Sequence, residues 1–183
     1  MDLTLILGPM KSGKSFDLIS HFAPLQYTDL RFALFQSSRN VRDETVWSRS
    51  GAGLAARKVA NLRSLLREDL EVVGVDEIHM FSAKDVAILK TLLNQGTRVV
   101  ASGLDMDYRG KMFGVVRKLL ELGPAEVRYK RAVCEVCRQP EAIYTQVLRG
   151  KEPVVEGIPS VIPEDGTYSY MPVCRGCFFF TPD

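Results

Sequence analysis

The sequence has little excess charge of either sign, no long apolar run and no internal repeat. Its 183 residues include 24 Lys and Arg against 22 Asp and Glu, which gives a net charge of +2. It therefore lacks the clustered basic excess of a surface that coats nucleic acid. No stretch is long enough in apolar residues to span a bilayer, and the first residues lack the basic start of a secretory signal. We therefore expect a cytoplasmic protein with neither a membrane nor a nucleic acid among its partners.

Cysteine is scarce, and its four occurrences form two C-x-x-C pairs, Cys134 with Cys137 and Cys174 with Cys177. In a reducing compartment, paired cysteines indicate metal or redox chemistry before structural disulfides. Four thiolates are the tetrahedral ligand set of structural Zn²⁺, and a closed set leaves no position for a reactive water. A thioredoxin-like redox pair is the alternative, and the duplication of the pair argues against it. We therefore predict a structural zinc site.

Residues 8–15 fit the pattern G-x-x-x-x-G-K-S and follow the apolar run Leu3 to Leu7, so they predict a phosphate-binding loop. The two glycines let the backbone turn its N–H groups toward a polyphosphate, and the next helix adds its positive dipole end. Lys14 would reach the β- and γ-phosphates, and Ser15 would offer its hydroxyl to Mg²⁺. The predicted ATP-binding residues are Gly8, Pro9, Met10, Lys11, Ser12, Gly13, Lys14 and Ser15.

Apolar runs and helical spacings alternate along the first two thirds of the chain. This alternation predicts an α/β fold, a parallel sheet flanked by helices with its ligands at the carboxyl ends of the strands. Leucines three and four residues apart indicate a helix within 61–68, whereas the polar stretch 36–53 indicates a loop. The predicted strands are 3–7, 32–35, 70–77 and 98–102, and the other predicted helices begin near Ser15, run through 86–96 with Ser82 as the cap, and span 115–122.

An acid pair, Asp76 and Glu77, ends the predicted third strand. In phosphate-loop proteins, a strand near the loop ends in the carboxylate that organises Mg²⁺. We therefore assign Asp76 to Mg²⁺ together with Ser15, and Glu77 to proton abstraction from the group that attacks the γ-phosphate. That group is either water or a substrate hydroxyl, so residue chemistry alone leaves ATP hydrolysis and phosphoryl transfer open.

The composition changes near residue 130, where the cysteines begin and prolines separate short β-like pieces. We place a domain boundary there. Residues 1–129 are predicted to form the ATP-binding domain with the phosphate loop, and residues 130–183 a small zinc-binding domain.

The order of these pieces resembles the type II thymidine kinase family over nearly the whole chain. The family's phosphate loop, GPM(F/Y)SGK(S/T), differs from residues 8–15 only at Lys11. Its segment L-D-x-(D/T)-(F/Y)-(R/Q)-x-x-x-F-G is matched by residues 104–114, and its acid strand end D-E-x-Q-F-F aligns with residues 76–81. Residues 170–177, which contain the second cysteine pair, resemble the zinc-bound lasso domain of the family.

The resemblance implies transfer of the γ-phosphoryl group of ATP to the 5′-hydroxyl of thymidine or deoxyuridine, a step of nucleotide salvage for DNA synthesis. It implies Mg²⁺, a structural Zn²⁺, Glu77 as the base and a homotetramer. Arg42, at the place of the family's D-x-R-Y motif, is assigned to phosphate binding. In the family, main-chain groups of the lasso bind the edge of the thymine ring. The resemblance assigns four side chains to the nucleoside, namely Leu104, Tyr108, Phe113 and Tyr170.

Several residues depart from the family pattern. Asn40 stands where the family has Asp, and His79 and Met80 replace Gln and Phe, with His79 interpreted as a packing or surface residue. Pro163 removes a donor N–H near the lasso tyrosine, so another nucleoside is an open alternative.

Two other classes of function also stay open. One is a phosphate-loop ATPase whose zinc module acts on nucleic acid, supported by the short basic cluster Arg128, Lys130 and Arg131. The other is a phosphate-binding regulatory module without turnover.

Overall fold

A computed structural model describes residues 2–40, 45–47, 53–162 and 166–180. Its main feature is a six-stranded parallel sheet in the order β5-β2-β6-β7-β1-β8. This sheet confirms the predicted α/β class. Its strands are β1 (Leu3–Leu7), β2 (Phe32–Ser37), β5 (Arg57–Val59), β6 (Val72–Asp76), β7 (Arg98–Gly103) and β8 (Glu126–Tyr129).

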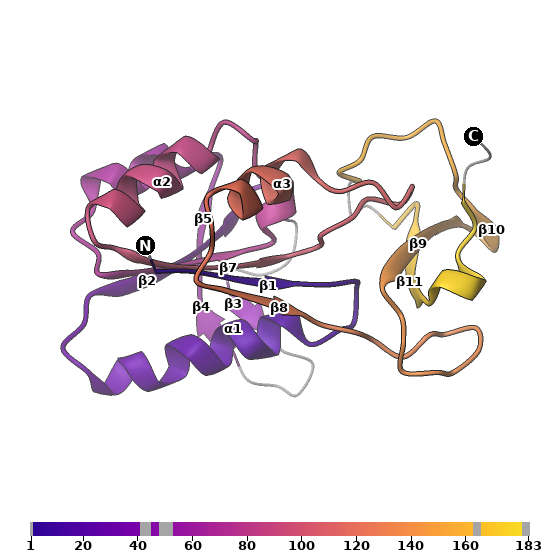
Figure 1. The fold of residues 1–183 in the computed structure, drawn as a ribbon, viewed down its shortest axis with the longest axis horizontal. Helices are drawn as coiled ribbons and strands as arrows, with labels where there is room; N and C mark the ends of the chain where they lie inside the picture. Colours follow the sequence, from indigo (N-terminus) through magenta and orange to yellow (C-terminus); the bar gives the residue numbers. More distant parts are fainter. Residues whose placement is uncertain (1, 41–44, 48–52, 163–165, 181–183) are drawn as a thin grey trace.

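Helices cover both faces of this sheet (Figure 1). Helix α1 (Lys14–Phe22) packs on one face, and α2 (Val86–Asn94) and α3 (Gly114–Glu121) pack on the other. The central strands β1 and β6 are buried along their whole length, which explains why they are nearly continuous apolar runs. None of the helices in the described ranges has the length and apolar character needed to cross a membrane.

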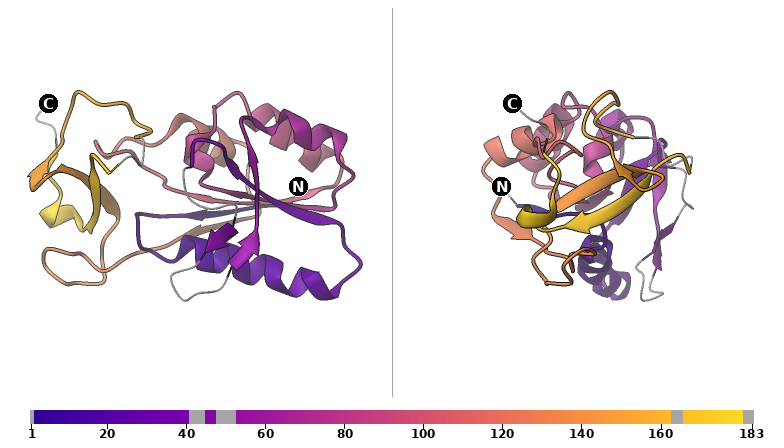
Figure 2. Two further views of the ribbon diagram at one scale, coloured as in Figure 1. Left: turned by 180° about the vertical axis from the view of Figure 1, so that it is seen from behind. Right: turned by 90° about the vertical axis from the view of Figure 1, so that its right-hand side faces the viewer.

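A second, three-stranded antiparallel sheet lies at one end of the molecule, beyond the carboxyl ends of the main strands (Figures 1 and 2). It consists of β9 (Tyr144–Arg149), β10 (Glu152–Pro153) and β11 (Ser169–Val173), with β9 in the centre. A 3₁₀ turn, η4 (Arg175–Cys177), follows β11. We keep residue 129 as the proposed domain boundary, because the chain leaves the main sheet after β8.

The stretch 36–53, predicted as a loop, contains more regular structure than expected. Strand β2 continues to Ser37, and β3 (Thr45–Trp47) pairs with β4 (Gly53–Ala55) in an antiparallel ribbon. The short strand β5 then joins the edge of the main sheet beside β2. Two-stranded ribbons and three-residue edge strands lack a continuous apolar run, so the sequence pattern alone does not indicate them.

Two other local predictions are wrong in detail. The segment 61–68 forms a 3₁₀ helix, η2 (Leu62–Arg67), because Leu62 and Leu65, three apart, are the buried pair and Leu66 is exposed. Ser82 does not cap α2, which begins at Val86. Instead, the Asp85 carboxylate accepts backbone N–H groups from Leu62 and Ser82, and this turn precedes the helix. The remaining 3₁₀ turns are η1 (Ala23–Tyr27) and η3 (Ile78–Met80).

Candidate functional site

The phosphate loop connects β1 to α1 and has an unusual backbone. Gly8, Lys11 and Gly13 have φ angles of 147°, 63° and 81°, in the region that favours glycine. A Cβ on Gly8 would lie 2.5 Å from the carbonyl oxygen of Lys130, so only glycine fits where the loop passes the chain leaving β8. Lys11, which replaces the family's aromatic residue, adopts this conformation at a steric cost.

The loop offers donors that suit a polyphosphate. Lys14 is buried, and its ammonium group donates to the carbonyl oxygen of Pro9 at 2.7 Å, so it lies over the loop. The buried Ser12 hydroxyl has no hydrogen-bond partner among the residues that the structure describes. Gly13 precedes α1 and supplies no side-chain cap, and the first backbone N–H groups of a helix are the groups that bind an anion at its N-terminus. The residues present therefore fit a bound phosphate group.

Asp76 lies at the carboxyl end of β6 on the sheet face that α1 covers. It is paired in register with Gln36 of β2, and its Oδ1 accepts a hydrogen bond from the Ser102 hydroxyl at 2.5 Å. Burial, followed by the charge of Glu77, raises the pKa of Asp76 to about 7, although Ser102 and Lys14 oppose this shift. A carboxylate that burial disfavours in this way gains from a divalent cation nearby. Asp76 thus fits the magnesium role predicted for it.

This raised pKa predicts that Asp76→Asn stabilises the protein in the absence of Mg²⁺. In the unfolded chain Asp76 ionises near 3.8, whereas in the folded chain it keeps its proton up to about 7. The free energy of unfolding therefore falls as pH rises from about 4 to 7, and Asp76 contributes up to roughly 4 kcal/mol of this decrease. Asn keeps an acceptor for Ser102 and carries no charge. We expect Asp76→Asn to melt above wild type at pH 8, with the difference shrinking toward pH 5.

Thermal melts of both proteins across this pH range test the prediction. Adding Mg-ATP should then raise the melting temperature of wild type more than that of Asp76→Asn. Equal melting temperatures from pH 5 to 8 would show that Asp76 carries no burial cost.

Glu77 follows directly and starts the 3₁₀ turn η3. Its φ of 50° is unusual for a residue with a side chain and marks local backbone strain at the strand end. The side chain is buried, and its Oε2 lies 3.5 Å from Nδ1 of His79. Glu77 lines a cavity, whereas the neighbouring Asp76 does not line it and bonds to Ser102.

This cavity brings together the side chains that were predicted to bind the nucleoside. It has a volume of about 30 Å³, far below the roughly 300 to 1,000 Å³ of a small-molecule pocket, so a nucleoside enters only if part of the wall moves. Met10 of the phosphate loop and Glu77 are among its lining residues. The other lining residues are His79, Met80, Leu104, Met106, Asp107, Tyr108, Phe113, Thr145, Val147, Ser160, Val161, Ile162 and Tyr170.

The segment 158–162 contributes Ser160, Val161 and Ile162 to the cavity wall, and side chains of the 104–114 loop hold this segment. The Tyr108 hydroxyl donates to the carbonyl oxygen of Ile158 at 2.8 Å. Ser160 donates to the Asp107 carboxylate at 3.0 Å and accepts from the Arg109 guanidinium at 2.8 Å. Tyr108 was predicted to bind the nucleoside, whereas Asp107, Arg109 and Ser160 were given no role. In the sequence, only the opposite charges of Asp107 and Arg109 hint at these contacts.

The phosphate loop also contacts the cysteine-containing end of the chain. The backbone N–H of Met10 donates to the Thr145 hydroxyl of β9 at 2.9 Å. Lys11 forms an ion pair with Glu135, which lies between the first two cysteines. These contacts join the loop that would hold ATP to the module that would hold zinc.

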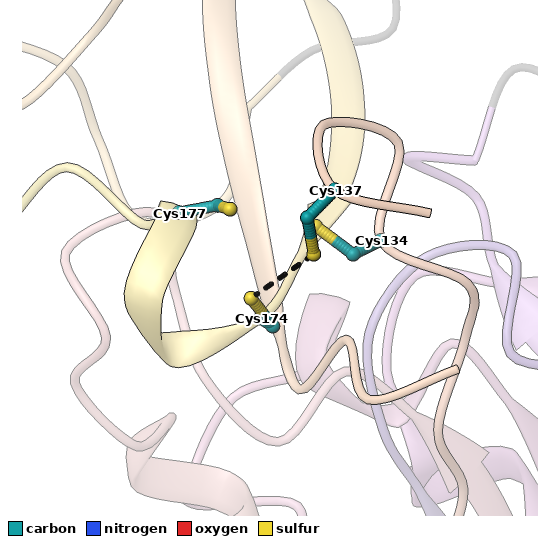
Figure 3. A group of neighbouring side chains, drawn as sticks. All are labelled: Cys134, Cys137, Cys174 and Cys177. Carbon is teal, nitrogen blue, oxygen red and sulfur yellow. Dashed lines mark hydrogen bonds between the residues drawn. The ribbon is translucent and has the colours of Figure 1, made fainter. Parts of the chain in front are cut away.

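All four cysteines meet in one cluster (Figure 3). Their Sγ atoms lie within 4.8 Å of one another, and those of Cys137 and Cys174 are 3.7 Å apart. A tetrahedral Zn²⁺ with bonds of about 2.3 Å places its sulfur ligands about 3.8 Å apart, whereas a disulfide requires about 2.05 Å. The cluster therefore fits a structural zinc ion.

The ionisation of the thiols agrees with this fit. Burial raises the pKa of Cys134, but backbone N–H donors of Cys137, Cys174 and Val136 outweigh it and lower the pKa to about 6. The pKa of Cys177 is raised to about 12, first by its hydrogen bond with Cys174 and then by burial. The Cys134 thiolate thus forms easily, whereas Cys177 ionises near neutral pH only if a cation lies close to it.

Two residues singled out from the sequence, Arg42 and Pro163, lie outside the described residues. The phosphate role of Arg42 therefore stays a prediction.

The fold and the site together define an α/β protein with a phosphate loop, an acid pair at a strand end and a cysteine cluster that can hold a metal. A family model described as thymidine kinase matches residues 1–178. The chain therefore belongs to the thymidine kinase family, which confirms the resemblance.

Among solved structures, the chain is similar to the cytoplasmic domain of the type VII secretion ATPase EccC of Thermomonospora curvata. The sequence identity is 13% and the TM-score 0.43, and the match covers 94% of this chain. It covers 24% of that chain, so this protein spans about a quarter of its length.

Proposed function

We propose that this protein is a thymidine kinase that transfers the γ-phosphoryl group of ATP to the 5′-hydroxyl of thymidine or deoxyuridine. The observation that carries the proposal is the shared cavity wall. Glu77 lies on it together with Met10 of the phosphate loop and with Leu104, Tyr108 and Phe113. Because Glu77 shares this wall with the phosphate loop and with the proposed nucleoside residues, a base there would reach both ligands, and this supports the proposal.

In this proposal, residues 8–15 bind the phosphates of ATP, and Lys14 balances their negative charge. Ser15 and Asp76 would hold Mg²⁺, which supplies further positive charge at the phosphates. Arg42 is proposed to add a phosphate contact. Glu77 accepts the proton of the 5′-hydroxyl as that oxygen attacks the γ-phosphorus.

The nucleoside would lie among the side chains of the cavity. Tyr108, Phe113 and Tyr170 offer aromatic surface to the base, and Leu104 adds apolar contact. The segment 158–162 would supply main-chain groups to the edge of the base. Closing this segment over the substrate excludes water, which favours phosphoryl transfer over ATP hydrolysis.

The zinc module would have a structural role, with Cys134, Cys137, Cys174 and Cys177 as ligands. Assembly as a homotetramer and residence in the cytoplasm follow from the family resemblance and belong to the same proposal.

The alternative of a nucleic-acid-dependent ATPase has less support. Arg128 pairs with Glu126, and Lys130 pairs with Asp17 at 2.9 Å. Two of the three basic residues behind that alternative are therefore engaged within the chain. Acidic partners reduce their use for binding a phosphate backbone.

A panel of nucleosides tests the proposal. Purified protein with Mg-ATP is incubated with thymidine, deoxyuridine, deoxycytidine or deoxyguanosine, and product formation gives kcat/KM for each. We expect thymidine and deoxyuridine to have the highest values. If no pyrimidine 5′-monophosphate forms from any nucleoside in the panel, the proposal is refuted. ATP turnover stimulated by a polynucleotide but not by thymidine would favour the ATPase.

A further inference from the structure

The segment 158–162 is held on the cavity by side chains and not by its own main chain. It lies in no helix or strand, and no backbone–backbone hydrogen bond joins it to another part of the described chain. Its hydrogen bonds with other described residues all come from the loop 104–114 and reach the Ile158 carbonyl oxygen and the Ser160 hydroxyl. Ile158 and Ile162 add apolar contacts in a small cluster with Tyr108 and Val147.

Asp107 is the fixed side of this attachment. The residue is buried, and its Oδ1 accepts the backbone N–H groups of Arg109 at 2.9 Å and of Lys111 at 3.0 Å. Its Oδ2 accepts from Nη2 of Arg109 at 2.6 Å and from Nε at 3.1 Å. All four bonds lie within the turn 107–111. Asp107 and Arg109 can therefore keep their places when the segment 158–162 moves away.

The Ser160 hydroxyl joins the segment to this charged pair. It donates to Oδ2 of Asp107 at 3.0 Å and accepts from Nη2 of Arg109 at 2.8 Å. A hydroxyl carries one donor proton and two acceptor lone pairs, so one group can bond to a carboxylate and a guanidinium together. Because both partners are charged, these bonds are stronger than bonds between neutral groups.

The attached segment keeps the cavity small. Three of its residues line the cavity, whose volume is about 30 Å³. Other lining residues belong to the antiparallel sheet, with Thr145 and Val147 in β9 and Tyr170 in the paired strand β11. Strands bonded to each other resist displacement more than a segment without main-chain hydrogen bonds does. The segment 158–162 is therefore the part of the wall that gives way to a ligand.

We propose that Asp107, Arg109 and Ser160 form a latch that closes the empty cavity, and that the nucleoside enters when Ser160 leaves the other two residues. This inference rests on the proposed function and adds to it a step that precedes phosphoryl transfer. The closed form has no room for a nucleoside, so closure of the latch and binding of the nucleoside compete. The open fraction of the protein then sets the observed affinity, and a weaker latch gives tighter binding.

Ser160→Ala tests the latch, because it removes both bonds of the hydroxyl and leaves the pair of Asp107 and Arg109 in place. We expect the association rate constant for thymidine to rise roughly tenfold, the effect of losing a charge-assisted hydrogen bond from the closed form. The dissociation rate constant should stay within about threefold, so Kd falls. Surface plasmon resonance with thymidine and without ATP measures both constants.

Ser20→Ala is the matched control. It removes an exposed hydroxyl of α1 that bonds to the carbonyl oxygen of Phe16, and it should change neither rate constant by more than about twofold. If Ser160 only supported the fold or held the base, its loss would weaken thymidine binding. An unchanged or slower association of thymidine with Ser160→Ala, or a higher Kd, overturns the proposal.

A measurement on the free protein separates the latch from the proposed function. Relaxation dispersion of isoleucine methyl groups reports exchange between closed and open forms on the microsecond to millisecond timescale. The open fraction reported by Ile158 and Ile162 should rise roughly tenfold in Ser160→Ala, whereas the buried Ile6 of β1 should be unaffected. Identical Ile158 and Ile162 signals in both proteins overturn the latch. A larger open fraction without thymidine binding to either protein supports the latch and refutes the proposed function.

Discussion

Replacing Glu77 with Gln is expected to lower kcat for thymidine phosphorylation by roughly 10²- to 10⁴-fold, the usual contribution of a general base. Glutamine has the same shape but cannot accept the proton of the 5′-hydroxyl at neutral pH. The phosphate loop does not include this residue, so the affinity for Mg-ATP should change by no more than about threefold. Steady-state kinetics and titration with a fluorescent ATP analogue measure the two quantities separately.

Glu126→Gln is the matched control. It makes the same chemical change in β8, where the carboxylate pairs with Arg128 on the surface. It should leave kcat within about twofold, since exposed ion pairs contribute little. A Glu77→Gln enzyme with wild-type kcat would exclude Glu77 as the base and leave water or the nucleotide itself as the proton acceptor.

Loss of the cysteine cluster is expected to have the second large effect. Structural Zn²⁺ contributes apparent free energies of about 10 to 16 kcal/mol in small zinc modules. The aromatic stack of Tyr144 on Phe178, with ring centroids 4.4 Å apart, packs beside the cluster and depends on the same chain path. We expect Cys137→Ser to remove about one zinc ion per chain and to abolish cooperative folding of residues 130–183.

The effect should reach the phosphate loop, because Thr145 and Glu135 contact Met10 and Lys11. Metal analysis, near-ultraviolet circular dichroism and KM for ATP measure these consequences, and we expect KM to rise. Val136→Ser is the control, since it alters an exposed side chain between the first two cysteines and leaves every sulfur in place. A metal-free Cys137→Ser protein with wild-type stability and KM would show that the cluster has no structural role.

The central part of the fold could be predicted from the sequence because buried parallel strands are continuous apolar runs. For this reason β1 coincides with its predicted range, β6 lies within its range, and β7 runs only one residue beyond its range. The edge strand β8 was missed. Its residues, Glu-Val-Arg-Tyr, are half exposed and alternate in polarity, so they resemble a surface segment. The same applies to β5, which has only three residues.

In the candidate site, too, some features could be predicted from the sequence and others could not. The phosphate loop, the acid pair and the cysteine pairs have fixed local spacings, and the predicted nucleoside residues Leu104, Tyr108, Phe113 and Tyr170 all line one cavity. Long-range contacts have no such local pattern. Met10 and Thr145 are 135 positions apart, and Asp107 and Ser160 are 53 apart, so only the folded chain reveals that they meet.

The position of His79 illustrates a second limit. A single histidine after an acid pair suggests packing, since no second ligand or base is near it in sequence. Its contact with Glu77 depends on the left-handed turn at that residue and on the approach of Leu104 from the end of β7. Neither feature can be inferred from the spacing of the residues.

The most direct test of the account is the fate of the γ-phosphate. The protein is incubated with Mg-ATP labelled at the γ-phosphorus and with thymidine, and the labelled products are separated and identified by phosphorus NMR. The account predicts that the label appears in thymidine 5′-monophosphate, and that Glu77→Gln lowers the rate of its appearance roughly 10²- to 10⁴-fold. Label found only in inorganic phosphate, at the same rate with and without thymidine, would contradict it.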